Sequence, residues 1–142
     1  MVRLELIREK IRRLRDTGAL LAKCLPPDAQ RLRAERDARD LLAFRVYLVV
    51  QEAIDLCSHV IADQGWGPAP SLRDHFSILA DKGILPASLA LNLAAAIKVR
   101  NLIGHAYVEI DPDKLHAAAT ALLTLVDPFC AGVLEFAEAN PS

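Results

Sequence analysis

Apolar residues recur every three or four positions along most of the chain, which is the spacing of one face of an α-helix. Over residues 1–25 they form a single stripe, made of Leu4, Ile7, Ile11, Leu14 and Leu21. Charged residues fill most of the positions between them, and Pro26 and Pro27 follow. Proline cannot continue a helix, so the pattern predicts an amphipathic first helix that ends before this pair.

A second helix is predicted from about Ala29 to Ile61, with Asp28 as its cap. Residues 31–40 alternate in charge and should face solvent, whereas residues 41–50 are apolar nearly all round the helix. A helix covered on only one side would not tolerate such a run. We therefore expect a second subunit to cover the excess apolar surface, which predicts a homodimer.

The second half of the chain carries clear helix boundaries. Residues 63–70, rich in Gly and Pro, form a loop, and Ser71 with Asp74 resembles a capping box that opens a short helix ending near Gly83. An Ala-rich helix follows over about 89–99, just after Pro86.

The last helix should begin at Asp111 and Pro112, where Asp acts as a cap and Pro occupies the first turn. It should run to about Ala139 with a kink at Pro128. Together these patterns predict an all-α, up-and-down helical bundle of about five helices that forms a single domain over residues 1–142.

Composition supports this fold class and says little about partners. Apolar residues make up 53% of the chain but aromatic residues only 5%, so aliphatic side chains must build the core. The net charge is −1, which gives no general case for binding nucleic acid. Residues 1–45 hold 12 Lys or Arg against 7 Asp or Glu, and residues 46–142 hold 5 against 11. This asymmetry indicates either a basic binding surface or the solvated faces of amphipathic helices.

Three scattered cysteines, Cys24, Cys57 and Cys130, and a basic start without an apolar signal segment favour a cytoplasmic protein with buried thiols. No metal or other cofactor is expected, because Asp55 and His59 share a helix face but have no further ligand set around them.

A membrane location is not expected either. Arg45 interrupts the apolar run of the second helix, which is also too short to span a bilayer. In the last helix, Asp127 and Pro128 would fall near the middle of the bilayer.

A polar octet lies where the Ala-rich helix runs out. Its sequence is Arg100-Asn101-Leu102-Ile103-Gly104-His105-Ala106-Tyr107. On a straight helix Arg100 and Tyr107 lie about 20° apart, but Arg100 and His105 lie about 140° apart. The arginine and the histidine can therefore face one small target only if the helix kinks, for which Gly104 is a permissive residue, or if two copies of the site meet.

The octet has residue types that can act on a phosphate group. Histidine is the side chain whose charge ordinarily changes near neutral pH, so His105 can act as a general base or acid. Arg100 has a planar cationic fork for phosphate oxygens. Asn101, about 40° from His105, could orient its imidazole or bind phosphate. On residue chemistry alone another interpretation stays open, in which Arg100 and His105 complement the helix dipole and Tyr107 anchors the core.

The octet resembles the signature of HepT, the HEPN-domain ribonuclease toxins whose antitoxin is a minimal nucleotidyltransferase called MntA. Residues 51–60 resemble the middle helix of that family, and residues 71–86 resemble its short third helix and the turn after it. The resemblance implies a HEPN-like fold and a metal-independent ribonuclease with Arg100 and His105 as catalytic residues at a dimer interface. It also implies that an MntA-like antitoxin silences the protein by transferring AMP to Tyr107.

Two other functions remain open at this stage. One is a catalytically silent HEPN-type module whose octet only binds a nucleotide or a partner, and the other is a structural helical adaptor.

Overall fold

A computed structural model describes residues 3–105 and 109–141. Every regular element within them is a helix, as the periodicity predicted. In chain order the helices are α1 (Leu4–Cys24), α2 (Gln30–Ala34), α3 (Arg36–Gln64), α4 (Leu72–Asp81), α5 (Ala87–Gly104) and α6 (Pro112–Ala139).

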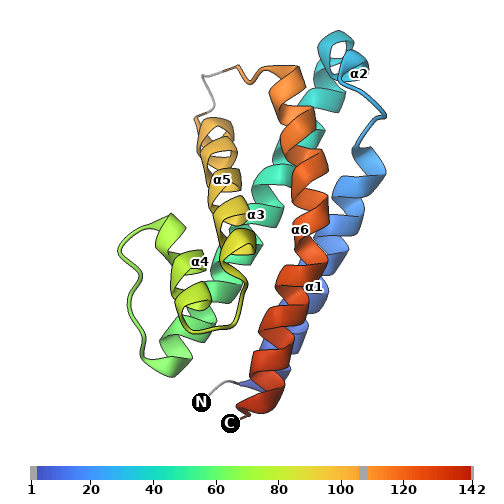
Figure 1. The fold of residues 1–142 in the computed structure, drawn as a ribbon. Coiled ribbons are helices and arrows are strands. Elements are labelled where there is room, and N and C mark those ends of the chain that lie inside the picture. Colours follow the sequence, from blue (N-terminus) through green and yellow to red (C-terminus); the bar gives the residue numbers. More distant parts are fainter. Residues whose placement is uncertain (1–2, 106–108, 142) are drawn as a thin grey trace.

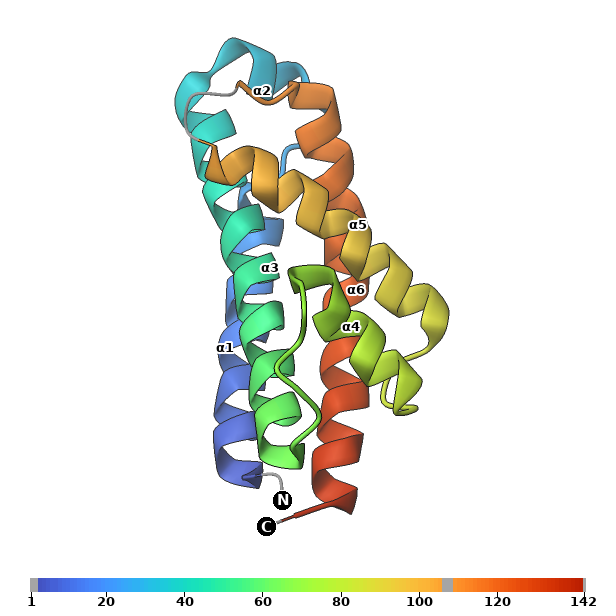
Figure 2. The same cartoon turned by 90° about the vertical axis from the view of Figure 1, so that its left-hand side faces the viewer.

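The four long helices α1, α3, α5 and α6 run alternately up and down, which confirms the predicted up-and-down bundle (Figure 1). Helices α1, α3 and α6 pack on one another. Helices α4 and α5 pack together on one side of them, as the rotated view shows (Figure 2). The end of α5, the start of α6 and the short α2 lie at the end of the bundle that is far from both termini (Figure 1).

The predicted second helix is in fact two helices, which raises the expected number of about five to six in the described residues. The break lies at Glu35, whose backbone is extended with φ −120° and ψ 110°. No Gly or Pro marks this position, so no local signal in the sequence predicts the break. Leu32 is fully buried, and α2 packs against α3 and α6. We attribute the break to this tertiary packing, which outweighs the helix propensity of the segment.

The helix boundaries that rested on capping signals are confirmed. The backbone N–H of Asp74 donates to Ser71 Oγ at 3.4 Å, and Ser71 Oγ donates in turn to Asp74 Oδ2 at 2.7 Å. At the start of α6, Asp111 Oδ1 accepts the backbone N–H of Asp113 at 2.9 Å. Pro128 lies inside α6 as predicted.

The core is aliphatic with a small aromatic centre. Phe76 of α4 and Phe129 of α6 are buried and meet edge to face, with ring centroids 5.9 Å apart. The thiols of Cys57 and Cys130 are buried as well. Burial raises the pKa of both thiols, that of Cys130 to about 11, so these two groups are unreactive core residues.

One helix in the described residues, α6, is long and apolar enough to cross a membrane by length and composition alone. In this fold α6 packs against α1, α3 and α5 and buries Leu115, Leu122 and Phe129. These apolar residues of α6 thus form part of the core of the bundle.

Candidate functional site

The helix expected over about 89–99 begins at Ala87 and continues to Gly104, so its predicted end was too early and the first five residues of the octet lie on its last turns. His105 is the first residue beyond the helix, with φ −90° and ψ 87°, and its side chain is exposed. The chain does not use the special freedom of glycine at Gly104, because its φ is not positive. A Cβ added there would lie 3.6 Å from the Tyr47 ring, an ordinary contact. Tyr107 lies outside the described residues.

Helix α5 ends at Gly104, directly before His105, so the chain breaks at the residue that the sequence analysis named as permissive. Because His105 lies beyond the helix, the separation of about 140° expected on a straight helix does not apply to it. The composite site stays a prediction.

Arg100 is held by side chains that the sequence analysis did not single out. Its Nε and Nη2 both donate to Gln51 Oε1, at 3.2 and 2.8 Å. Nη2 also donates to the hydroxyl of Tyr47 at 3.2 Å, and the guanidinium carbon lies 4.9 Å from the centre of the Tyr47 ring. Tyr47 and Gln51 are one turn apart on α3, which places both on the face that meets α5.

Asn101 completes this network. Its Oδ1 accepts a hydrogen bond from Arg100 Nη1 at 2.9 Å, so this oxygen supports the arginine. Arg100 is half-buried and has three side-chain partners, which is not the state of a solvated charge at a helix end. A half-buried cation in a fixed position has a stronger field than a solvated one.

The network also limits how Arg100 can meet an anion. The edge formed by Nε and Nη2 already faces Gln51, and it could grip a phosphate with two bonds only if Gln51 moved away. The Nη1 side, shared with the exposed Asn101, is the more accessible one. Arg100 is therefore suited to supply positive charge and a single directed N–H.

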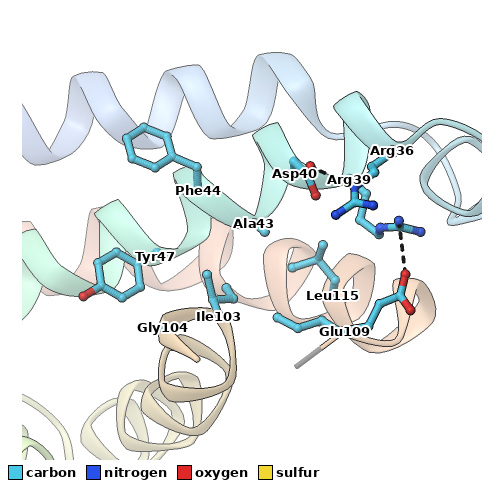
Figure 3. A pocket seen from close by; sticks show the side chains of 11 residues that line it. Arg36, Arg39, Asp40, Ala43, Phe44, Tyr47, Ile103, Gly104, Glu109 and Leu115 are labelled. Carbon is cyan, nitrogen blue, oxygen red and sulfur yellow. Dashed lines mark ion pairs between the residues drawn. The ribbon is translucent and has the colours of Figure 1, made fainter. Parts of the chain in front are cut away.

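A pocket of about 730 Å³ opens beside the octet, which we call the α3/α5 pocket (Figure 3). Its lining residues come from α3, from the end of α5, from the segment before α6 and from its first turn. They are Arg36, Arg39, Asp40, Ala43, Phe44, Tyr47, Ile103, Gly104, Glu109, Ile110 and Leu115. Tyr47, Ile103 and Gly104 connect this pocket to the Arg100 network.

The two ends of the α3/α5 pocket differ in character. Phe44 and Tyr47 lie at one end, and Arg36 and Arg39 at the other (Figure 3). Each arginine has an acidic neighbour: Arg36 Nε lies 3.6 Å from Asp40 Oδ2, and Arg39 Nη2 lies 3.4 Å from Glu109 Oε1. The pocket therefore has an apolar and aromatic surface next to two arginine side chains.

The apolar run 41–50 is only partly used inside the chain. Leu42, Val46, Val49 and Val50 are buried, whereas Leu41 and Phe44 keep 42% and 59% of their surface exposed. On α5, Leu102 is 44% exposed. Leu41 and Phe44 belong to the apolar run from which the sequence analysis predicted a homodimer, and the dimer itself stays a prediction.

A family comparison decides where the chain belongs. The profile of the family described as Ribonuclease HepT-like matches residues 7–133. This chain is a member of the HepT-like family. The resemblance carried by the octet is thereby confirmed at the level of the family.

The HepT-like chain also has a curated relative. It is 26% identical over 86 residues to the mRNA nuclease HepT of Shewanella oneidensis. The matched part is 61% of this chain and 65% of that protein, just under two thirds of the relative's length.

Solved structures share the fold. A toxin–antitoxin complex with AMP-PNP contains a chain with TM-score 0.82 and 20% identity, covering 91% of this chain and 97% of that one. The tri-AMPylated HEPN toxin of Shewanella oneidensis, in complex with its MNT antitoxin, gives TM-score 0.80 and 21% identity, over 89% and 95%. YutE of Bacillus subtilis, a cytosolic protein of unknown function, gives 0.83 and 18%, over 100% and 98%. At these identities the likeness establishes the HEPN-like fold alone.

Proposed function

We propose that this HepT-like chain is a metal-independent ribonuclease toxin that cleaves RNA with Arg100 and His105 at the interface of a homodimer. The observation that supports this best is the fixed, half-buried cation of Arg100, held by Gln51, Tyr47 and Asn101 close in sequence to an exposed His105. The similarity to an mRNA nuclease from Shewanella oneidensis points to the same reaction.

The proposed reaction needs no metal because RNA carries its own nucleophile. A neutral imidazole takes the proton of the 2′-OH, the 2′-oxygen attacks the neighbouring phosphorus, and a 2′,3′-cyclic phosphate forms. The bond to the 5′-oxygen breaks, and an imidazolium protonates that leaving oxygen. In a dimer, one His105 from each copy supplies the base and the acid. Arg100 stabilises the negative charge that accumulates on the phosphate.

The dimer in this proposal uses the exposed apolar side chains of α3 and α5, namely Leu41, Phe44 and Leu102. Light scattering at low micromolar concentration should give twice the 15.5 kDa mass of one chain. A stable monomer would contradict both the dimer and the composite site.

The proposed off switch is the transfer of AMP to Tyr107 by an MntA-like nucleotidyltransferase antitoxin. It is supported by the tri-AMPylated toxin among the structures of similar fold. A nucleotide attached two residues from His105 would add bulk and negative charge where the RNA phosphates must enter. The protein is proposed to act in the cytoplasm, where RNA, ATP and such a partner are present.

Cleavage in EDTA tests the catalytic proposal. Wild-type protein should cut RNA without divalent metal, leave a 2′,3′-cyclic phosphate and a free 5′-OH, and fail on a substrate with a 2′-deoxy scissile nucleotide. His105→Ala should lower the rate about 10²- to 10⁴-fold, the usual contribution of a general acid or base. His75→Ala in α4 is a matched control and should retain activity. If wild type and His105→Ala are equally inert on every RNA, the chain is a silent binding module.

Mass spectrometry tests the switch. Incubation with the antitoxin, ATP and Mg²⁺ should add mass in steps of AMP on the peptide that holds Tyr107. Tyr107→Phe should stay active and escape this neutralisation. AMP on another residue, with Tyr107→Phe still silenced, would refute the switch.

A further inference from the structure

The α3/α5 pocket has no assigned ligand, and its composition is that of a nucleotide site. Its volume of about 730 Å³ lies within the range of small-molecule sites. Ile103, Ile110 and Leu115 give it an apolar lining, and Tyr47 provides an aromatic face. Nucleobases pack on such surfaces in single-stranded nucleic acid sites, because every base has a π-face.

The opposite end of the pocket is suited to a phosphate. Arg39 keeps only 18% of its side chain exposed and also donates from Nη1 to the carbonyl of Leu32 at 3.5 Å, so its position is supported by the fold. Its acidic neighbour Glu109 is 81% exposed. Such a pair is worth little in water, so an incoming phosphate can replace Glu109 at small cost. Arg36 stands beside Arg39 on the same rim (Figure 3).

The pocket is continuous with the proposed catalytic site. Tyr47 lines the pocket and also bonds Arg100, and Gly104 lines it directly before His105. From Tyr47 to Arg39 the α3 axis advances about 12 Å, since each residue adds about 1.5 Å. This advance is longer than the distance between neighbouring phosphates of one strand, so a strand with one phosphate at Arg100 would meet Arg39 with a phosphate further along.

We propose that the α3/α5 pocket binds the nucleotide that flanks the scissile phosphate of a single-stranded RNA. The base packs on the apolar lining between Tyr47 and Ile103, and a phosphate further along the strand replaces Glu109 at Arg39. This inference rests on the proposed ribonuclease function, but it concerns binding and can be tested without cleavage.

Binding of a fluorescent single-stranded RNA, followed by anisotropy in the His105→Ala protein, tests the pocket while the RNA stays intact. Adding Arg39→Gln should weaken binding about tenfold, the usual loss for one charge-assisted bond. It should also reduce the slope of log affinity against log salt concentration by about 0.7, which is the contribution of one phosphate contact on a single strand. Adding Ala43→Leu, which fills the apolar part of the pocket without changing its charge, should weaken binding and leave that slope unchanged.

Arg31→Gln is the matched control, because Arg31, like Arg39, pairs with an exposed acid, here Glu35, but does not line this pocket. It should bind RNA like the parent protein. If Arg39→Gln and Ala43→Leu bind RNA as tightly as Arg31→Gln does, the proposal is wrong.

Three other outcomes distinguish this proposal from other occupants of the pocket and from the proposed catalysis. If Arg39→Gln and Ala43→Leu weaken the binding of free AMP but not that of RNA, the pocket binds mononucleotides, and the proposal is overturned. If Ala43→Leu or Arg39→Gln dissociates a dimer in light scattering, a second copy covers the pocket, which also overturns it. If wild type cleaves no RNA but the predicted binding pattern appears, the pocket stands and the proposed catalysis fails.

Discussion

The packed layer of α1, α3 and α6 and the far end of α5 are built by opposite means. In the layer, side chains such as Leu14, Leu56 and Phe129 are almost completely buried and meet other apolar groups. At the end of α5, one cation is held by polar side chains from two helices, next to an open pocket. Substitutions in the layer should therefore change stability, whereas substitutions near Arg100 should change binding or catalysis.

The charges differ between these regions as well. Six of the 12 Lys and Arg residues within residues 1–45 lie on α1, where some of them meet acids of the neighbouring helices. Lys10 pairs with Asp55 of α3 at 2.7 Å, and Arg8 pairs with Glu138 of α6 at 3.2 Å. The charge asymmetry of the sequence is thus largely compensated within the fold. The proposed RNA site relies on the few cations beside the octet and not on those of α1.

Phe129→Ala should have the largest effect on stability. Phe129 is 1% exposed and packs on Phe76, so its truncation should lower the free energy of unfolding by about 3–5 kcal/mol. Urea unfolding measures this change. Leu91→Ala, at a position 69% exposed on α5, should cost less than about 0.5 kcal/mol. RNA cleavage per folded molecule should stay near the wild-type value in both variants. A large loss of cleavage in folded Phe129→Ala protein would contradict the view that core residues affect stability and not catalysis.

The same contrast explains how much the sequence could predict. The starts of α4 and α6 follow from local signals, Ser71 with Asp74 and Asp111 with Pro112, because capping involves neighbours only. The break at Glu35 has no local cause and needed the packing of Leu32.

The octet itself was recognisable from its residue types and spacing, but its supports were not. Gln51 and Tyr47 precede Arg100 by 49 and 53 residues. The only hint in the sequence was their spacing of four on a predicted helix, a pattern too common to identify them. The α3/α5 pocket likewise combines residues from three helices and could not be predicted from any one segment.

Gln51→Ala should have the largest effect on activity among the residues that position Arg100. It removes the acceptor for both Nε and Nη2, and a hydrogen bond to a charged group is worth about 1.5–3 kcal/mol. RNA cleavage should fall about 10- to 100-fold, mainly in kcat, because the guanidinium loses its fixed place. Gln64→Ala at the end of α3 is the control. Unchanged cleavage in Gln51→Ala would mean that Arg100 acts in an orientation other than the one described here.

Tyr47→Phe should have a smaller effect, since it removes one bond of 3.2 Å and leaves the ring beside the guanidinium. We expect a loss of about 0.5–1.5 kcal/mol, or roughly 2- to 10-fold in kcat. Tyr47→Leu also removes the cation–π contact and should lose more. Equal activity of the two variants would show that the ring contributes nothing beyond its hydroxyl.

Glu52 tests the other side of the comparison, because it is a titratable group within the α1/α3 contact. Its Oε1 accepts the hydroxyl of Thr17 at 3.0 Å, and its Oε2 is buried with no hydrogen-bond partner among the described residues. Burial raises the pKa of Glu52 above its ordinary value of 4.5. The Thr17 bond and the charges of Arg13 and Lys10 on α1 oppose this increase, and Asp55 on α3 adds to it.

Glu52→Gln should give the smallest effect, one that depends on pH. A raised carboxyl pKa means that the folded state binds the proton more tightly than the unfolded state, so wild-type stability falls as the pH rises from 4.5 through the raised pKa. The glutamine variant does not titrate. It should therefore be more stable than wild type at pH 7 and lose this advantage as the pH falls through the raised pKa towards 4.5. Thermal unfolding across this range, with Glu138→Gln at an exposed position as the control, measures the difference. A gap that stays constant with pH would mean that Glu52 is solvated in the folded protein.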